Sequence, residues 1–175
     1  MMKRYFPILL FLLCSCELNQ SSQELGQVQG YIPVYASRDV INTIITEISR
    51  PTVRPGKVYA YGSFLFQVEQ NEGIHIIDNR TPAQAKKIAF LKVPMASELS
   101  IKSDHLYTNN LNDLVVFDLS NVSSPKLVNR VKDAFPVIDQ LNPPFAGTAF
   151  ECADPAKGIV VGWERRMLNQ PKCRR

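Results

Sequence analysis

Two aspartates are the residues of this sequence best placed for acid–base chemistry. Asp78 and Asp118 each follow an apolar run, and they lie forty positions apart. Two carboxyl groups that meet in one cleft can act as general acid and general base. A carboxylate after a strand also accepts hydrogen bonds from the next backbone N–H groups, which is typical of a turn. We therefore expect Asp78 and Asp118 to be repeat turn residues, with catalysis at a shared cleft as the alternative.

The two histidines do not complete a catalytic or metal-binding set. His75 lies between Ile74 and Ile76, where a packed histidine is expected, and His105 follows a turn. Neither has a cysteine at the spacing of a zinc site. The chain also lacks the Gly-x-Ser-x-Gly elbow, the G-x-G-x-x-G loop and the P-loop. We predict no catalytic residue, no metal site and no cofactor.

The N-terminus has the three-part order of an export signal. Lys3 and Arg4 precede an apolar run that ends in Leu13-Cys14-Ser15-Cys16. The run is shorter than the roughly 20 residues that a membrane-spanning helix needs. Its end resembles the lipobox of bacterial lipoproteins, which implies that residues 1–15 are removed and that Cys16 is lipidated. The alternative is ordinary secretion, with cleavage near Ser21–Ser22.

Two further cysteines, Cys152 and Cys173, remain after this assignment. In an oxidising envelope compartment they are expected to form a disulfide. Loss of Lys3 and Arg4 lowers the formal net charge from +4 to +2 (4 − 2), which does not indicate nucleic-acid binding. Residues 166–175 are basic and are predicted to be a solvated tail, with contact to phosphate-bearing lipid as the alternative.

The rest of the chain divides into a tether and a β domain. Residues 16–29 are polar and are predicted to be a flexible tether. Apolar residues at helical spacing, with Ser37 as a cap, predict one short helix over residues 37–48. From residue 57 the period changes to two, and the pattern predicts four strands over 57–93 and four more over 98–131. Residues 149–153 and 158–164 are predicted to pair as a C-terminal hairpin.

The two four-stranded units align at a period of about forty residues, which is typical of β-propeller blades. The runs 73–78 and 113–128 resemble the LVIVD repeat, found in propeller-like envelope lipoproteins of Bacteroidota. The second unit matches closely, whereas the first has Ala85 where the second has Pro125. The resemblance implies an all-β, propeller-like domain over residues 30–165.

Two complete units are fewer than the four to eight blades of a closed propeller. Either the two sheets stack as a small sandwich or several chains complete a ring. The sandwich is favoured, because one chain then buries both apolar faces.

The segment Pro143-Pro144-Phe145 is stiff and apolar at its tip, and we expect it to be a contact loop. Together these features predict a lipid-anchored binding or scaffolding module of the outer membrane, facing the periplasm or the cell surface. Its expected partners are the membrane, through the lipid, and a protein or glycan. An envelope hydrolase that uses acidic residues of a propeller-like cleft is the alternative function.

Overall fold

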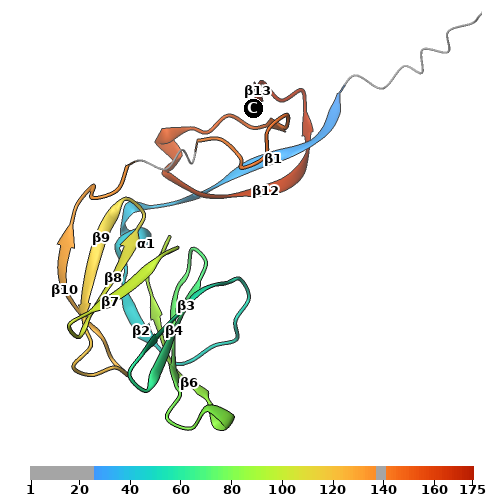
Figure 1. Cartoon of the computed structure of the whole chain (residues 1–175). Helices are drawn as coiled ribbons and strands as arrows, with labels where there is room; N and C mark the ends of the chain where they lie inside the picture. The colour runs from blue at the N-terminus through green and yellow to red at the C-terminus, as the bar shows by residue number, and fades with distance from the viewer. Residues whose placement is uncertain (1–25, 137–140) are drawn as a thin grey trace, which may run out of the picture.

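The computed structural model describes residues 26–136 and 141–175, which form three β-sheets and one short α-helix (Figure 1). The predicted signal over residues 1–15 and the predicted lipidation site, Cys16, lie outside the described residues. Within them, no helix is long and apolar enough to cross a membrane.

A first repeat sheet has five strands in the order β2-β6-β5-β4-β3. They are β2 (Ile45–Glu47), β3 (Pro55–Tyr61), β4 (Phe64–Glu69), β5 (Gly73–Asp78) and β6 (Lys86–Lys92). Strands β3 to β6 form an antiparallel meander, and the 3-10 helix η1 (Pro82–Gln84) connects β5 to β6.

A second repeat sheet has four antiparallel strands in the order β10-β9-β8-β7. They are β7 (Leu99–Lys102), β8 (His105–Asn110), β9 (Asp113–Asp118) and β10 (Lys126–Val131). The eight strands predicted over 57–93 and 98–131 are therefore present.

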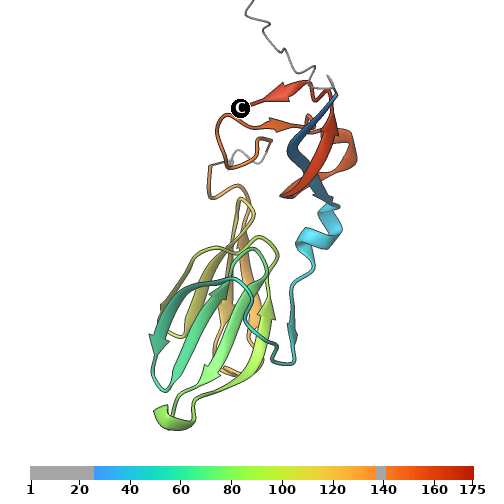
Figure 2. The ribbon, with the colours of Figure 1, turned by 90° about the vertical axis from the view of Figure 1, so that its right-hand side faces the viewer.

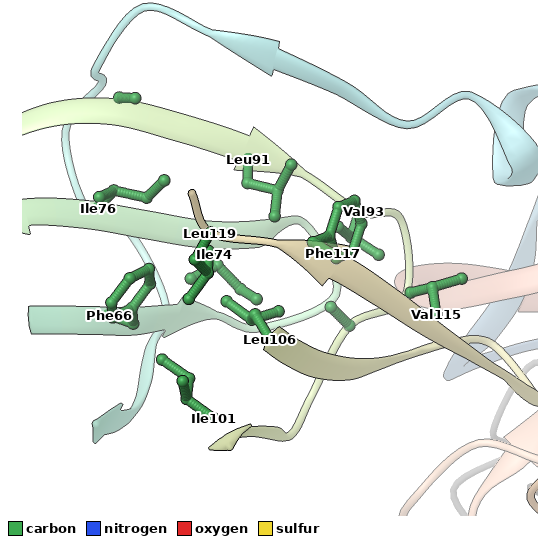
Figure 3. Packing of buried hydrophobic residues seen from close by; sticks show 12 residues of the cluster. Phe66, Ile74, Ile76, Leu91, Val93, Ile101, Leu106, Val115, Phe117 and Leu119 are labelled. Atoms are coloured by element: carbon green, nitrogen blue, oxygen red, sulfur yellow. The ribbon is translucent and has the colours of Figure 1, made fainter. Parts of the chain in front are cut away.

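The two repeat sheets face each other across one apolar core (Figures 2 and 3). Alternate residues of each strand point into it, because successive side chains leave a strand on opposite faces. The buried cluster contains Phe66, Ile74, Ile76, Ala89, Leu91, Val93, Ala96, Ile101, Leu106, Val115, Phe117 and Leu119. At one edge the hydroxyl of Tyr59 donates to the Ile101 carbonyl at 3.2 Å. The two sheets thus stack as the sandwich arrangement requires, and the described residues form no closed barrel or propeller.

The predicted helix is shorter than expected. Helix α1 spans Arg38–Asn42, and its N-cap Ser37 accepts a hydrogen bond from the Val40 N–H at 3.3 Å. The prediction of helix up to residue 48 is wrong, because β2 (Ile45–Glu47) pairs with β6 there. The β-branched residues of this segment lose side-chain freedom in a helix and favour the extended backbone of an edge strand.

A third, mixed sheet lies beyond one end of the repeat sheets (Figures 1 and 2) and has the order β12-β1-β11-β13. Its strands are β1 (Gln27–Ala36), β11 (Ala149–Phe150), β12 (Ile159–Asn169) and β13 (Cys173–Arg174), with the 3-10 helix η2 (Pro155–Lys157) before β12. The predicted C-terminal hairpin is wrong, because β11 and β12 do not pair with each other. Strand β1 lies between them, antiparallel to β12 and parallel to β11.

The mixed sheet also takes in residues that were expected to be outside the domain. Strand β1 begins at Gln27, inside the segment predicted as a tether, and pairs with Asn169. Residues 166–169 and 173–174, predicted as a solvated tail, belong to β12 and β13. Backbone pairing orders these segments although most of their side chains are exposed.

Candidate binding groove

The two repeat aspartates occupy equivalent turns. Asp78 Oδ1 accepts from the Arg80 N–H at 3.0 Å, and Asp118 Oδ1 accepts from the Ser120 N–H at 2.7 Å. The Arg80 side chain adds an ion pair to Asp78, at 2.6 Å. Hydrogen bonds from the Arg80 side chain and N–H lower the pKa of Asp78 to about 2. The Ser120 N–H lowers the pKa of Asp118. Each carboxylate thus accepts a hydrogen bond from the backbone N–H two residues further along the chain, within its own turn.

Asp78 ends β5 of the first repeat sheet and Asp118 ends β9 of the second, and each carboxylate bonds to its own turn rather than to the other. His105 Nδ1 lies 2.7 Å from the Ser103 carbonyl oxygen. Among the described residues, no group of three or more His, Cys, Asp and Glu side chains is placed to hold a metal ion.

His75 has a partner that the sequence did not indicate. Its Nε2 lies 2.9 Å from Glu69 Oε2, and both side chains are buried. Glu69 also accepts hydrogen bonds from the backbone N–H groups of Val53 and Arg54, which precede β3. The pair therefore fastens the segment that enters the first repeat. Glu69 also borders a surface hollow with Arg50, Val53 and Glu72, but only 2% of it is exposed and its oxygens are already hydrogen-bonded.

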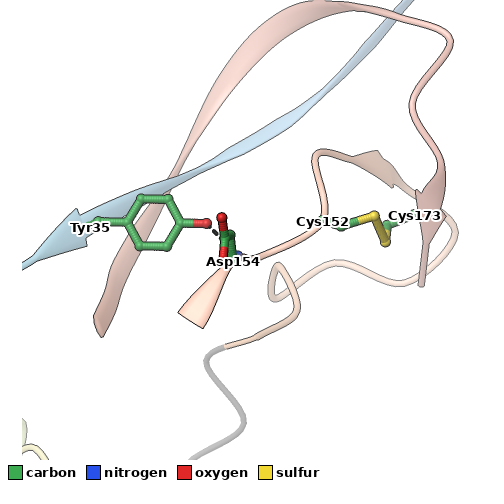
Figure 4. Close-up of a disulfide and its surroundings, with 4 residues drawn as sticks. All are labelled: Tyr35, Cys152, Asp154 and Cys173. Carbon is green, nitrogen blue, oxygen red and sulfur yellow. Dashed lines mark hydrogen bonds between the residues drawn. A yellow bond between two sulfur atoms is a disulfide. The ribbon is translucent and has the colours of Figure 1, made fainter. Parts of the chain in front are cut away.

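The pair of cysteines in the mixed sheet is joined by a disulfide (Figure 4). Cys152 follows β11 and Cys173 begins β13. Nearby, the Asp154 N–H donates to the Tyr35 hydroxyl at 2.7 Å and so attaches the connection after β11 to β1. These links hold the short strands β11 and β13 against the long β1–β12 ribbon.

The expected contact loop is only partly exposed. Pro143 is buried, and its carbonyl accepts a hydrogen bond from the Arg175 guanidinium at 2.5 Å. Pro144 and Phe145 are exposed, and the Phe145 ring lies 5.8 Å from that of Tyr31. The Phe145 carbonyl accepts a hydrogen bond from the Thr148 hydroxyl at 2.7 Å. The loop is therefore fixed at its base and presents Pro144 and Phe145 outward.

Pro144 lines a groove between the mixed sheet and the turns of the repeat sheets. The groove has a volume of about 480 Å³, within the range of small-molecule and peptide-side-chain sites. Its lining residues are Asn71, Met95, Ser97, Leu111, Asn142, Pro144, Val160, Val161, Gly162, Trp163 and Arg175. Phe145, the neighbour of Pro144, is not among them.

A second hollow of about 200 Å³ continues this groove toward α1, and the two share Asn71, Met95 and Val161. Together they form what we call the junction groove, a depression that follows β12 where it passes the repeat sheets. Grooves where two structural units meet are common ligand sites.

Three residues that line the junction groove have left-handed backbones. The φ angles are 65° at Asn71, 65° at Met95 and 57° at Leu111. Asparagine adopts this conformation readily, whereas it is uncommon for residues such as methionine and leucine, for which it carries a free-energy cost of about 1 kcal/mol or more. Such outliers persist where the surrounding structure holds them, and they gather at functional sites.

A polar network holds the left-handed residues in place. The Met95 N–H donates to the Asn71 carbonyl at 2.9 Å, and the Asn109 side-chain amide donates to the Met95 carbonyl at 2.8 Å. The same amide oxygen accepts from the N–H groups of Ser97 and Glu98, which precede β7. Asn109 thus binds the segment that leads into β7, as Glu69 binds the segment that leads into β3. Asn109 also positions Met95.

The chemistry of the groove is that of a binding site. Aliphatic side chains, Trp163 and a proline form its walls, and Trp163 is held edge-on against Phe150 at 5.4 Å. Asn71 and Ser97 supply uncharged polar groups, and Arg175 supplies one cation. Such a lining fits a partly apolar ligand that offers hydrogen-bonding groups.

The comparisons with known proteins bear on the sheet beside the groove. The family model of the LVIVD repeat matches residues 95–133. Residues 95–133 form an LVIVD repeat. The match begins at the left-handed Met95, covers β7 to β10 and takes in Leu111, so the repeat supplies two of the three strained groove residues. Neither the curated proteins nor the solved structures gave a match to the chain.

Proposed function

We propose that this protein is a lipid-anchored binding module of the outer membrane, which captures a segment of a partner protein in the junction groove and carries out no chemistry on it. The observation that carries the proposal is the meeting of three left-handed residues, Asn71, Met95 and Leu111, in one groove. The N-terminal lipobox supports the anchor, and the LVIVD repeat supports an envelope lipoprotein of Bacteroidota.

A polypeptide segment is the ligand that the lining favours. Met95, Leu111 and Val161 offer an apolar surface for side chains, while Asn71 and Ser97 offer partners for backbone amides. Trp163 is half-buried, and its ring already packs against Phe150, which leaves less of it for stacking on a sugar. The hydrolase alternative gains no support from Asp78 and Asp118, whose carboxylates are bound in separate turns.

The anchor is tested by fractionating cells that produce Cys16→Ser. The variant is expected to leave the membrane fraction, because the thiol that would carry the lipid is gone. A Cys14→Ser variant is the matched control, since Cys14 lies inside the predicted signal, and it should remain with the membrane. Retention of Cys16→Ser in washed membranes would contradict lipid anchoring.

The groove is tested by placing a photo-crosslinking residue at Pro144 and, in a second strain, at Phe145. Both side chains are exposed, but only Pro144 lines the groove. A discrete protein adduct is expected from position 144 and not from position 145. Equal adducts at both positions would contradict specific capture.

A pair of glycine substitutions makes this test sharper. A Cβ added at Gly162 or at Gly26 meets nothing within 4 Å, so both positions have room for a side chain to begin. Gly162→Leu places a side chain in the groove and should abolish the adduct, whereas Gly26→Leu should leave it unchanged. If no protein adduct forms, but Gly162→Leu reduces retention on immobilised envelope glycan, the ligand is a glycan instead.

A further inference from the structure

The outer edge of β10 has no partner strand in the described part of the chain. Strand β10 is an edge strand of the second repeat sheet, and among the described strands it pairs with β9 alone (Figure 1). Its counterpart in the first repeat sheet, β6, is paired on both sides, by β5 and by β2. The second repeat sheet therefore has one strand fewer than the first, and the difference falls at this edge.

The register of β10 on β9 repeats that of β6 on β5 with a constant offset of forty residues. Lys86 and Lys126 each lie opposite the aspartate that ends the preceding strand, and each outer strand has its bulge two residues further on. Strand β2 pairs with residues 90–92 of β6. The same offset places residues 130–132 at the matching positions, and we call these three residues the open edge.

The backbone groups of Arg130 and Lys132 point away from β9. Along a strand, the N–H and C=O groups of successive residues face the two neighbouring sides in turn. The Asp133 N–H donates to Asp113 Oδ1 at 3.0 Å, on the β9 side, so the groups of Lys132 and Arg130 face the other side. The Arg130 N–H donates to the Asn129 side-chain oxygen at 2.8 Å. Within the described residues, the backbone of Lys132 forms no hydrogen bond.

The charges of this segment select the kind of strand that can pair with it. Its charged residues, Lys126, Arg130 and Lys132, are all cations. If two β10 strands paired through residues 130–132, cations would lie opposite cations, which is destabilising. A second copy of the chain is therefore a poor occupant. In the first repeat sheet, β2 brings a carboxylate to the matching place, where Glu47 lies 3.9 Å from Lys92.

A hollow beside the open edge has room for acidic side chains. It has a volume of about 370 Å³ and is lined by Arg38, Asn42, Asp113, Arg130, Lys132 and Asp133. Arg130 is paired with Asp113 at 2.6 Å, whereas Arg38 and Lys132 form no ion pair within the described residues. Arg130 and Lys132 are two positions apart, so their side chains share one face of the sheet. A side chain opposite either of them on an added strand would point to that same face.

We infer that the open edge binds an extended, acidic segment of a partner protein, which extends the second repeat sheet as an antiparallel strand, as β2 extends the first. The backbone of the segment bonds to Arg130 and Lys132, and its carboxylates lie beside these two side chains. Its apolar residue covers Val131, which is 45% exposed although it belongs to a paired strand. Such strand addition is a general mode of peptide recognition. None of residues 130–132 lines the junction groove, so this proposal does not depend on the proposed function.

The probe is a labelled peptide with the sequence of residues 43–49, which contain β2, carrying Ile45→Glu and Thr46→Val. In the register of β2 it places a carboxylate opposite Lys132 and another opposite Arg130. Its binding to the full chain carrying Cys16→Ser, which cannot be lipidated at that residue, is measured by fluorescence anisotropy. Saturable binding is expected, and its absence would overturn the proposal. A peptide carrying Ile45→Lys, Thr46→Val and Glu47→Lys should bind at least about fivefold more weakly.

Methylation of the peptide backbone separates strand addition from attraction between charges. In the register of β2, the N–H groups of peptide positions 45 and 47 point to the open edge, and that of position 46 points away. Methyl groups on the first two nitrogens should weaken binding about tenfold, because two backbone hydrogen bonds are lost. A methyl group at position 46 should change binding by less than about twofold. Equal effects from both modifications would overturn the proposal.

Two lysine variants of the protein locate the site. Lys132→Gln should weaken binding of the acidic peptide about two- to fivefold, because one cross-strand charge pair is lost. The control is Lys102→Gln, an exposed lysine of β7 at the opposite edge of the same sheet, which should bind like the parent. Equal losses would overturn the placement at the open edge. A dimer in light scattering that the acidic peptide dissociates would show that a second copy occupies the edge, and would overturn the assignment to a partner protein.

Discussion

His75 Nε2 lies 2.9 Å from the Glu69 carboxylate, and both side chains are buried beneath the segment that leads into β3. Nδ1, the other ring nitrogen, has no hydrogen-bond partner in the described part of the chain. The hydrogen bond and the unpaired Nδ1 fit a neutral ring that donates from Nε2 to Glu69. A second proton, on Nδ1, would place a buried charge without an acceptor.

This pair makes the stability of the domain sensitive to mild acid. Burial lowers the pKa of His75 below its ordinary value of 6.5, and Lys87 and Arg50 add to the effect against the opposing influence of Glu69. The unfolded chain therefore binds more protons than the folded one below that pH. The free energy of unfolding should fall as the pH drops through about 6.5, as measured by urea denaturation. His75→Gln should flatten this dependence.

Glu69 and Glu72 provide a matched comparison of a buried and an exposed carboxylate. Burial would raise the pKa of Glu69, but hydrogen bonds from the Arg54 N–H, His75 and the Val53 N–H lower it overall. Glu69→Gln should reduce the free energy of unfolding by about 1.5–3 kcal/mol, because a buried charged acceptor is lost. Glu72, which pairs with Arg50 at 3.1 Å and is 44% exposed, should contribute no more than about 1 kcal/mol. Equal losses from Glu69→Gln and Glu72→Gln would count against the buried clamp.

The disulfide should stabilise the mixed sheet more than the rest of the domain. Cys152 and Cys173 are separated by 21 positions, for which the entropy of loop closure corresponds to about 3 kcal/mol. Cys152→Ser with Cys173→Ser should lower the free energy of unfolding by that order. Amide hydrogen exchange should accelerate in β11 and β13 and stay slow in β5 and β9. Uniform acceleration across all three sheets would show that the bond supports the whole domain instead.

The turn aspartates should affect folding rather than turnover. Asp78→Ala and Asp118→Ala should each lower the melting temperature, because the backbone N–H of Arg80 or of Ser120 loses its hydrogen-bond acceptor. The contribution of Asp78 is present above pH 3.8 and is lost as the pH falls toward about 2, where the folded carboxylate becomes protonated. An unchanged melting temperature with loss of a hydrolytic activity would favour the enzyme alternative.

Met95 offers a way to separate stability from binding. Met95→Gly relieves the backbone strain of a left-handed methionine, which should stabilise the fold by about 1 kcal/mol. The substitution also removes a half-buried side chain, and this loss should offset the gain. The free energy of unfolding should therefore change by less than about 1 kcal/mol, while adduct formation at Pro144 falls sharply. A large loss of stability with retained crosslinking would mean that Met95 serves the fold and not the groove.

The repeat sheets were predictable because each strand pairs with a strand that is its neighbour in the sequence. Strands β3 to β10 have a period of two and are separated by turn residues such as Gly62-Ser63 and Ser103-Asp104, so neighbouring strands pair with little ambiguity. The mixed sheet was not predictable in the same way. Strand β1 contains Gly30 and Pro33, and its partner β12 lies more than one hundred residues away, at 159–169. No local pattern encodes such a pairing.

The groove escaped prediction for a related reason. Asn71, Met95 and Leu111 belong to three separate turns that meet only in the folded protein. None of these left-handed positions is a glycine, which is the residue type that usually indicates a positive φ in a sequence. Met95 and Leu111 appear in the sequence as ordinary apolar residues. Pro144 was the part of the site that the sequence did indicate, because proline-rich loops are recognisable on their own.

The position of β1 between β11 and β12 also dictates an order of assembly. The chain is synthesised, and in the proposed route exported, with β1 first, but both of its neighbours in the sheet come from residues after 148. The repeat sheets, which close between adjacent strands, can form while those residues are still emerging. Strand β1 must meanwhile wait as an unpaired ten-residue strand, a template for mispairing with other chains. We therefore expect the repeat sheets to fold before the mixed sheet, with β1 exposed to mispairing until its partners have been synthesised.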